Sequence, residues 1–449
     1  MTEPLLNPQE RQHLEALVAN NPSDSAGRRA RLFLMLDEGY PTRQAAELAG
    51  MTAGRARHWR GLFRAKGMMI FPASGTGRKE EAEPGIPDMP PGADQDSPEM
   101  DSTLLQQTPI PAWRQPEQTR PTFAEFMTGA AEIKTPGVIA EDSLAEAGRK
   151  VLRYHFAQML LHEEGTRKGE DIEELHDMRV ATRRMRAGFE VFGEAYTAKA
   201  LKNHLKGLRA TGRNLGSVRD LDVFMEKAEH YLDTLPPERH AELQPLLANW
   251  AQEREAARTQ MVAYLDSDKY ASFKKTFYEF LSTPGAGARR ASATGLLPSR
   301  VSEIAPVLVY SRLAAVRAFG AILENATLEQ FHALRIEFKK LRYTVEFFRE
   351  VLGEESKSVI NELKTVQDHL GDLNDADVAT KLLRDFLSVW DAQQNALPVS
   401  QRKSPEPVLA YLTYRYAERQ QLMQTFQDTW SHFSHPDFQH QLALAISVL

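Results

Sequence analysis

Residues 175–186 of the chain read LHDMRVATRRMR, and residues 331–342 read FHALRIEFKKLR. Histidine stands at the second position of both stretches, and basic residues stand at the fifth, ninth, tenth and twelfth. A second pair of matching segments follows, in which Leu215-Gly216 with Asp220 and Asp222 corresponds to Leu370-Gly371 with Asp375 and Asp377. Agreement over this length indicates a helical unit that is present twice.

Each of the two stretches predicts a helix with an apolar face beside a cationic face, because residues on a helix are spaced by about 100°. The apolar faces hold Met178, Thr182, Met185, Phe189 and Phe192, and Leu334, Phe338, Leu341, Val345 and Phe348. The cationic faces hold His176, Arg179, Arg183 and Arg186, and His332, Arg335, Lys339 and Arg342. Like charges at this spacing repel by a few tenths of a kcal/mol. An uninterrupted row of cations therefore favours an anionic ligand over a solvated face whose phasing arose by chance.

A second basic row is predicted on the helix that follows. Lys199, Lys202, Lys206, Arg209 and Arg213 share one face, whereas the second unit offers Lys357, Asn361, Lys364 and then Asp368. We expect a groove that is more basic on the side of the first unit, although a solvated helix face is the alternative here too.

The segments Leu175–Arg186 and Leu215–Val223, with their second copies, resemble the CHAD domain, the conserved histidine α-helical domain, over roughly residues 140–445. The resemblance implies two pseudo-symmetric four-helix bundles with a basic groove or pore between them that holds inorganic polyphosphate. It also implies association with polyphosphate granules. The residues predicted to bind are His176, Arg179, Arg183, Arg186, Lys202, Lys206, Arg209, Arg213, His332, Arg335, Lys339, Arg342 and Lys364.

The composition restricts the class of protein. Of 449 residues, 42 % are hydrophobic and 26 % are charged, and there is no cysteine, which excludes disulfides and cysteine-bound metals. No apolar run of membrane-spanning length and no secretory signal pattern is seen, so we expect a cytoplasmic protein without a membrane partner. The formal net charge is −6, which means that a polyanion site must be a local patch.

Three regions of an all-α chain are expected. Residues 1–70 predict a small helix-turn-helix domain, residues 71–137 a Pro-rich disordered linker, and residues 138–449 the duplicated region, with repeats at about 138–284 and 298–449. The linker contains eleven of the 25 prolines, and such a composition cannot sustain a helix or a strand. Phe123, Phe126 and Met127 could form a short docking helix near its end, but a flexible segment is favoured.

The first seventy residues resemble the helix-turn-helix of insertion-sequence transposases through Arg29-Ala30-Arg31 and the run from Tyr40 to Ala46. Helices are expected at Arg28–Leu36, at Thr42–Ala49 and from Thr52 through Phe63. Arg55, Arg57 and His58 would contact DNA from the last helix. A bundle reused for contacts with another protein is an equal alternative. With DNA at one end and polyphosphate at the other, the chain would link granules to DNA.

Catalysis, cofactors and metals are not predicted. Asp220, Asp222, Asp375 and Asp377 could be magnesium ligands, but helix capping or pairing with arginines is the favoured role. The two histidines are expected to cap or pack at the start of their helices. If bound phosphate raises a histidine pKa, binding would strengthen mildly as the pH falls toward 6. The alternative functions are a DNA-binding regulator that senses a small phosphorylated ligand, and a scaffold for polyphosphate-metabolising enzymes. The sequence does not define the oligomeric state.

Overall fold

The computed structural model describes residues 5–20, 25–51, 56, 59–61, 63, 67–71, 122–289 and 298–449. Every regular element in these ranges is a helix, apart from the two isolated bridges Ser143–Arg300 and Tyr196–Ala288. The all-α fold class is therefore confirmed. The chain divides into two compact units, Met1–Gln115 and Pro116–Leu449, and each is described separately.

The amino-terminal unit is a small helical bundle. Among the described residues its helices are α1 (Pro8–Asn20), α2 (Ser25–Asp37), α3 (Thr42–Leu48) and the 3-10 helix η1 (Gly67–Ile70), and residues 59–61 are helical too. Phe33 is fully buried at the centre of their core, and its ring lies 4.5 Å from that of Phe63. The first two predicted helices are thus present as α2 and α3. The predicted contact residues Arg55, Arg57 and His58 lie outside the described residues.

The carboxyl-terminal end of the predicted linker is structured. Helix α5 (Phe123–Thr128) and the 3-10 helix η3 (Gly129–Glu132) begin at a capping box between Thr122 and Glu125. Phe126 is buried, and its ring lies 5.9 Å from that of Phe156 on α6 (Leu144–Leu161). The expectation of a flexible segment was wrong for residues 122–137, because this aromatic contact and the cap stabilise a docking helix. The rest of the linker, up to residue 121, is outside the described ranges.

The first half of the larger unit contains α6, α7 (Glu163–Lys168), α8 (Ile172–Phe192), α9 (Ala198–Leu232), α10 (Gln244–Leu265) and α11 (Asp268–Ser282), with the 3-10 helices η4 (Gly193–Ala195) and η5 (Pro237–Leu243). Side chains of Ser143, Asp171 and Ser267 cap α6, α8 and α11. Such caps satisfy amide donors that the first helical turn leaves free. Helix α9 ends before Pro236-Pro237, as the sequence predicts.

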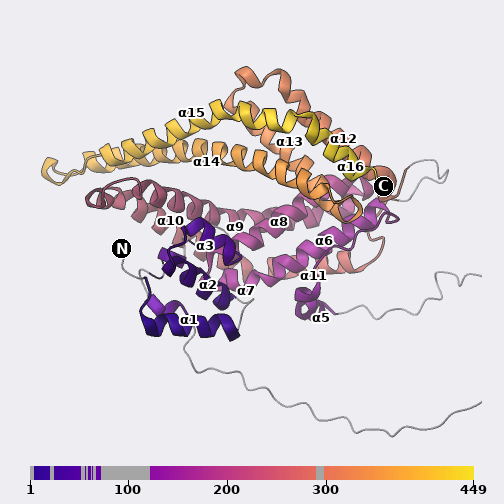
Figure 1. Ribbon diagram of the computed structural model, residues 1–449, viewed down its shortest axis with the longest axis horizontal. Coiled ribbons are helices and arrows are strands. Elements are labelled where there is room, and N and C mark those ends of the chain that lie inside the picture. Colours follow the sequence, from indigo (N-terminus) through magenta and orange to yellow (C-terminus); the bar gives the residue numbers. More distant parts are fainter. Residues whose placement is uncertain are drawn as a thin grey trace, which may run out of the picture. The chain divides into compact units, whose positions relative to one another are not determined.

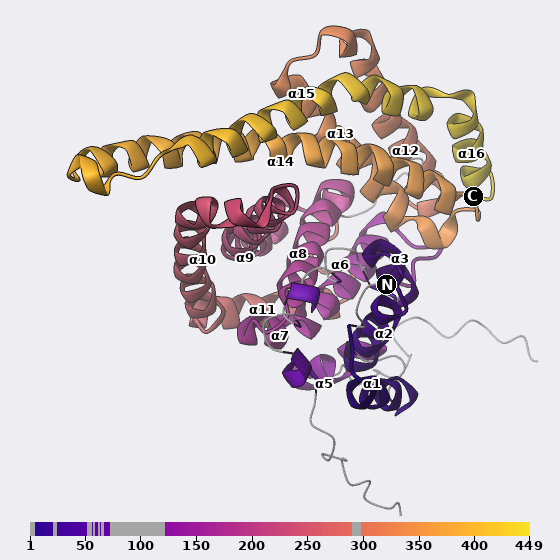
Figure 2. The same cartoon turned by 60° about the vertical axis from the view of Figure 1, so that its left-hand side comes forward.

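The second half repeats this order. It contains α12 (Val301–Arg317), α13 (Leu328–Phe347), α14 (Ser356–Asn395), α15 (Glu406–Ser434) and α16 (Pro436–Ile446), with the 3-10 helices η6 (Ala318–Ala321), η7 (Leu323–Asn325), η8 (Arg349–Val351) and η9 (Val399–Gln401). The two repeated sequence segments pair α13 with α8 and α14 with α9. In Figure 1 and Figure 2, α14 and α15 lie side by side as a long antiparallel pair.

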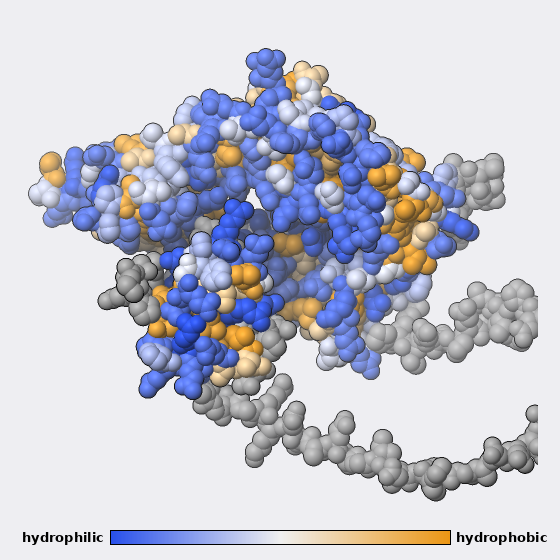
Figure 3. Space-filling view, viewed as in Figure 1, coloured by the Kyte–Doolittle hydropathy of each residue, from blue (hydrophilic) through white to orange (hydrophobic). Residues whose placement is uncertain are grey.

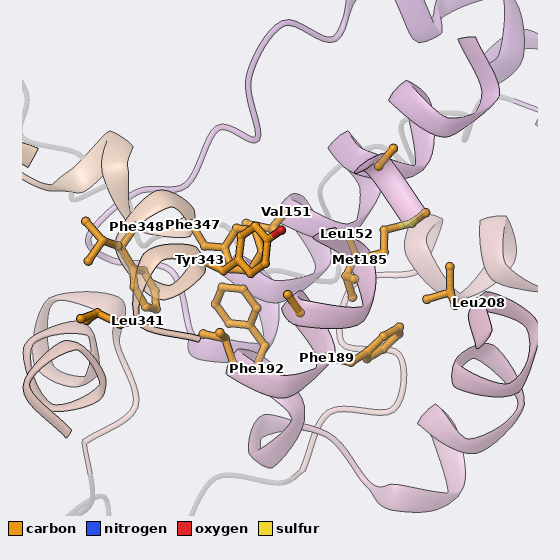
Figure 4. Packing of buried hydrophobic residues seen from close by; sticks show 14 of the residues in the cluster. Val151, Leu152, Met185, Phe189, Phe192, Leu208, Leu341, Tyr343, Phe347 and Phe348 are labelled. Atoms are coloured by element: carbon orange, nitrogen blue, oxygen red, sulfur yellow. The ribbon is translucent and has the colours of Figure 1, made fainter. Parts of the chain in front are cut away.

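One hydrophobic core joins the two halves. Helix α8 packs against α13, and α6 packs against α12. Figure 4 shows Phe192 of α8 beside Phe347 and Phe348 of the second half, with ring centroids 5.9 and 5.5 Å apart. At Gly148 of α6, an added Cβ would lie only 2.8 Å from the Phe192 Cβ, so the glycine permits a close approach of α6 and α8.

A second, separate contact lies near the ends of the long helices. It includes Phe224 and Tyr231 of α9, Trp250 of α10, Leu383 of α14 and Tyr411 of α15. The rings of Tyr231 and Tyr411 are 4.8 Å apart. Among the described residues, the halves therefore share two separate apolar clusters.

Helix α12 with η6 is the one described segment, Val301–Ala321, that has the length and apolar composition of a membrane span. Val301, Ala305 and Val309 of this helix are fully buried in the core that the two halves share. Its apolar character on that side is explained by this packing.

Candidate functional site

The cations of the two repeats meet where α8 packs against α13. Arg179 and Arg183 come from α8, and Arg335 and Lys339 come from the equivalent turns of α13. Each of these four side chains is half-buried. The charges of Arg179, Arg183 and Arg335 all lower the pKa of Lys339, which places the four groups within electrostatic reach of one another. We call these four residues the cation cluster.

Two carboxylates lie at equivalent positions beside the cation cluster. Asp220 of α9 accepts a hydrogen bond from Arg179 Nη2 at 2.8 Å. Asp375 of α14 is close enough to raise the pKa of Arg335 and Lys339, against the larger lowering effect of burial. The pKa of Asp220 is raised, first by burial and then also by Asp375, while Arg179 opposes the shift. Four cations thus face two acids, which leaves an excess of positive charge.

Two guanidinium groups of the cation cluster have unsatisfied donors. The Nε atoms of Arg183 and Arg335 are buried and have no hydrogen-bond partner within the part of the chain that is described. Buried polar groups in proteins nearly always have a partner, and one without it is costly. An anion bound across α8 and α13 could satisfy these donors only after the two guanidinium groups turn toward it, because both Nε atoms are inaccessible to solvent.

Behind the cation cluster, each histidine of the repeat contacts the helix that follows. Arg219 Nε donates to His176 Nδ1 at 3.3 Å, and at the equivalent place His332 Nδ1 lies 3.2 Å from Asn374 Oδ1. Burial, followed by Arg219, Arg183 and Arg179, lowers the pKa of His176 to about 4. Without a ligand, His176 is therefore neutral between pH 6 and 8. Stronger binding toward pH 6 would require bound phosphate to raise this lowered pKa of His176, and it stays a prediction.

The basic row on α9 is present and exposed. Lys199, Lys202, Lys206, Arg209 and Arg213 are all solvent-exposed, and at about 1.5 Å per residue the row is roughly 21 Å long. Arg186 of α8 is also exposed, and its Nη1 would lie 3.8 Å from a Cβ at Gly212 of α9. This places Arg186 beside α9, next to the end of the row at Arg213.

The second half is less basic, as the sequence predicts. Lys357 is paired with Glu354 at 2.5 Å, and Lys364 is exposed on a helix that also presents Asp368 and Asp372. Lys227 of α9 reaches across to Asp372 of α14 at 3.0 Å, so one of these acids already has a partner from the first half. Figure 3 shows mainly hydrophilic residues over α14 and α15.

Arg342 differs from the prediction. It is 7 % exposed, its Nε donates to Gln367 Oε1 at 2.7 Å, and it is paired with Glu346. Glu346 also lies 3.5 Å from Arg184 of α8, which connects the two halves. Arg342 therefore stabilises the contact between the halves, and it is not grouped with the cation cluster. Arg184 and Arg219 are not among the residues that the sequence predicts to bind. Arg184 could have been found from its repeat partner Lys340, and Arg219 from its place in the second matching segment.

The remaining aspartates are partners of arginines. Asp222 is paired with Arg254 of α10 at 2.5 Å, and Asp377 with Arg419 of α15 at 2.7 Å. All four aspartates lie inside long helices, which excludes a capping role. The alternative of arginine partners is confirmed for Asp220, Asp222 and Asp377.

The CHAD domain family matches residues 150–384, a range that begins in α6 and ends in α14 and contains the whole cation cluster. The chain belongs to the CHAD family. Two uncharacterized proteins of Mycobacterium tuberculosis, from strains CDC 1551 / Oshkosh and ATCC 25618 / H37Rv, are each 27 % identical over 237 residues. The match covers 50 % of this chain and 42 % of each relative, so the chain spans less than half of the length of these relatives.

Two solved structures are similar to this CHAD protein. The CHAD domain from the plant Ricinus communis is 23 % identical, with a TM-score of 0.48, and the match covers 70 % of this chain and 94 % of that one. PptA from Streptomyces chartreusis is 17 % identical, also with a TM-score of 0.48, and the match covers 65 % of this chain and 100 % of that one.

Proposed function

We propose that the CHAD region binds inorganic polyphosphate at the cation cluster and is not an enzyme. The observation that carries the proposal is the convergence of Arg179, Arg183, Arg335 and Lys339 from both halves, with Asp220 and Asp375 as the acids that act on them among the described residues. Guanidinium groups bind phosphate oxygens through paired hydrogen bonds, and an ammonium group acts as a compact charge. Membership of the CHAD family supports the same ligand class.

A polymer explains the basic surface better than a small phosphate does. The exposed row from Lys199 to Arg213 on α9 would extend the cation cluster by roughly 21 Å. Binding of single-stranded nucleic acid relies on exposed aromatic side chains that stack on bases. The aromatic residues of α8 and α13, such as Phe192 and Phe338, are buried in the core instead.

The absence of catalysis is part of the proposal. Asp220 is held by Arg179, and Asp222 and Asp377 are held by Arg254 and Arg419. These ion pairs leave the carboxylates poorly placed to hold magnesium or to act as a general base.

The test is a titration of the full chain with long-chain polyphosphate at low and at moderate salt. We expect tight binding that weakens steeply with salt, because the affinity of polyanions comes largely from released counterions. Changing Arg179, Arg183, Arg335 and Lys339 together to glutamine should abolish it. The control changes four exposed cations elsewhere, namely Lys269, Lys275, Arg402 and Lys403, to glutamine. Equal loss in both variants, or no binding by the folded wild type, would overturn the proposal.

A comparison of chain lengths separates the polymer from a small ligand. Long chains should bind more tightly per molecule than triphosphate, because they also contact the row on α9. Saturation by triphosphate with little further gain from longer chains would instead support a regulator that senses a small phosphorylated ligand.

For the amino-terminal unit we propose DNA binding, supported by the helix order of α2 and α3. The chain would then link polyphosphate granules in the cytoplasm to DNA. Charge reversal at Arg55 and Arg57 should abolish a gel shift with random duplex, and an unchanged shift would contradict the role of these residues. Retention of DNA on immobilised polyphosphate by the full chain tests the link. Failure of retention while both ligands bind separately would exclude it.

A further inference from the structure

Lys339 is the one lysine among the four residues of the cation cluster, and its repeat partner is Arg183. It is half-buried on α13, with Arg335 one turn earlier on the same helix and Arg179 and Arg183 across the contact on α8. Its carboxylate neighbour is Asp375 of α14, since Asp220 of α9 is paired with Arg179. Among the described residues, no carboxylate oxygen lies within 4.0 Å of the Lys339 amine.

The repulsion among these four cations can be reduced if the Lys339 amine loses its proton. Arginine side chains stay protonated in proteins, so the three guanidinium groups cannot lose their charge. Lysine can release a proton when burial and neighbouring cations disfavour its charged form. Both causes act here. Burial first, and then Arg335, Arg183 and Arg179, lower the pKa of Lys339 to about 7, although Asp375 opposes the shift.

We propose that Lys339 couples polyphosphate binding at the cation cluster to the uptake of a proton, so that the protein holds the polymer more tightly in mildly acidic than in mildly alkaline solution. The inference rests on the proposed function. It deepens that function, because it assigns the regulation of the site to one side chain.

The direction of the pH dependence follows from the charged groups that face Lys339. Without ligand, Arg335 of α13 and Arg179 and Arg183 of α8 disfavour the ammonium form, and Asp375 of α14 favours it. A bound phosphate adds negative charge and raises the pKa of Lys339, so the bound state takes up a proton at a pH where the free state has lost it. The affinity is then constant well below pH 7. It falls by up to tenfold per pH unit above pH 7, the limit for one linked proton.

The experiment uses the full chain and long-chain polyphosphate, whose terminal phosphates are a negligible share of its charge. Dissociation constants are measured at pH 6, 7 and 8 for the wild type, Lys339→Arg and Lys339→Gln. The arginine variant is the matched control, because it places in the second repeat the side chain that the first repeat has at Arg183. We expect the wild type to lose about fivefold in affinity between pH 7 and 8, because the free site is already half deprotonated at pH 7. Lys339→Arg should stay tight with less than a twofold change, and Lys339→Gln should be weak at every pH.

Calorimetry of the wild type gives a second readout that needs no variant. Titrations at pH 8 in buffers with different ionisation enthalpies report the number of protons taken up on binding. We expect close to one proton per site in the wild type and close to zero in Lys339→Arg. No proton uptake, or the same pH profile in Lys339→Arg, would overturn the inference while the proposed function stands. No binding at pH 6 would overturn the proposed function itself.

Discussion

At the scale of single residues, Asp220 competes with a bound anion for Arg179. It lies 2.8 Å from the guanidinium, and the side chains of Asp220 and Arg179 are 55 % and 35 % exposed, so the Arg179 left without this partner still contacts solvent. We expect Asp220→Asn to bind polyphosphate about three to ten times more tightly at low salt, because one repulsive charge is lost and one donor is released. Thermal unfolding should change little, since exposed ion pairs stabilise weakly.

The matched comparison is Asp222→Asn, two residues along the same helix. Asp222 is 4 % exposed at its side chain and holds Arg254, so its loss should destabilise the fold without improving binding. Unchanged or weaker binding by Asp220→Asn would show that this carboxylate organises the cation cluster and does not compete with the ligand.

A buried histidine predicts how stability depends on pH. Burial first, and then Arg184, lowers the pKa of His155 from 6.5 to about 3. In the unfolded chain, His155 therefore binds a proton below about pH 6.5. In the folded chain, it binds one only below about pH 3. The free energy of unfolding should fall by up to about 1.4 kcal/mol per pH unit across that window and be unaffected by this group above it.

Denaturant unfolding at pH 7 and pH 5 measures this dependence. His155→Leu should reduce the difference between the two values, whereas His230→Gln, which alters an exposed residue, should not. An identical difference in wild type and His155→Leu would mean that another group causes the acid sensitivity.

At the scale of helices, replacing either of two glycines by alanine should change the free energy of unfolding, with opposite signs at the two positions. A Cβ at Gly148 of α6 would lie 2.8 Å from the Cβ of Phe192, whereas a Cβ at Gly371 of α14 meets nothing within 4 Å. Gly148→Ala should destabilise by about 1 to 3 kcal/mol through overpacking. Gly371→Ala should stabilise by about 0.5 to 1 kcal/mol, because alanine loses less entropy in a helix.

Equilibrium unfolding of the two variants beside the wild type measures both effects. Equal stability of both variants would show that α6 can move away from α8 at little cost.

The helices of the larger unit could be predicted from apolar periodicity and from breaks such as Pro236-Pro237, because these depend on local sequence. The alignment of Arg179 and Arg183 with Arg335 and Lys339 followed from the repeat. The burial of Arg342 could not be predicted, because a helical wheel assumes that only one face of a helix is buried. The neighbouring Tyr343, Thr344 and Val345 are all buried, since α13 is also covered where the two halves meet. The docking of α5 depends on Phe126 meeting Phe156, a contact between residues thirty positions apart.

At the scale of the whole CHAD unit, the shared core predicts that the two halves unfold together. Phe192 of the first half lies between Gly148 and the second-half rings of Phe347 and Phe348. Phe192→Ala should cost about 3 to 5 kcal/mol through the cavity it leaves. The larger unit should still melt in a single calorimetric transition at a lower temperature. Separate transitions for the two halves would contradict a common core.

The packing of α8 on α13 has a further consequence. A site made from two copies on separate chains would fall apart on dilution, and both copies would have to carry the same side chains. Joining the copies in one polypeptide makes the site independent of protein concentration, because its halves meet within the molecule. A single chain also allows equivalent positions of the two repeats to carry different residues. Arg183 can remain a permanent charge while Lys339 becomes a group that titrates, and Arg219 can support one histidine while Asn374 supports the other. Covalent linkage thus allows the two sides of the site to carry different side chains.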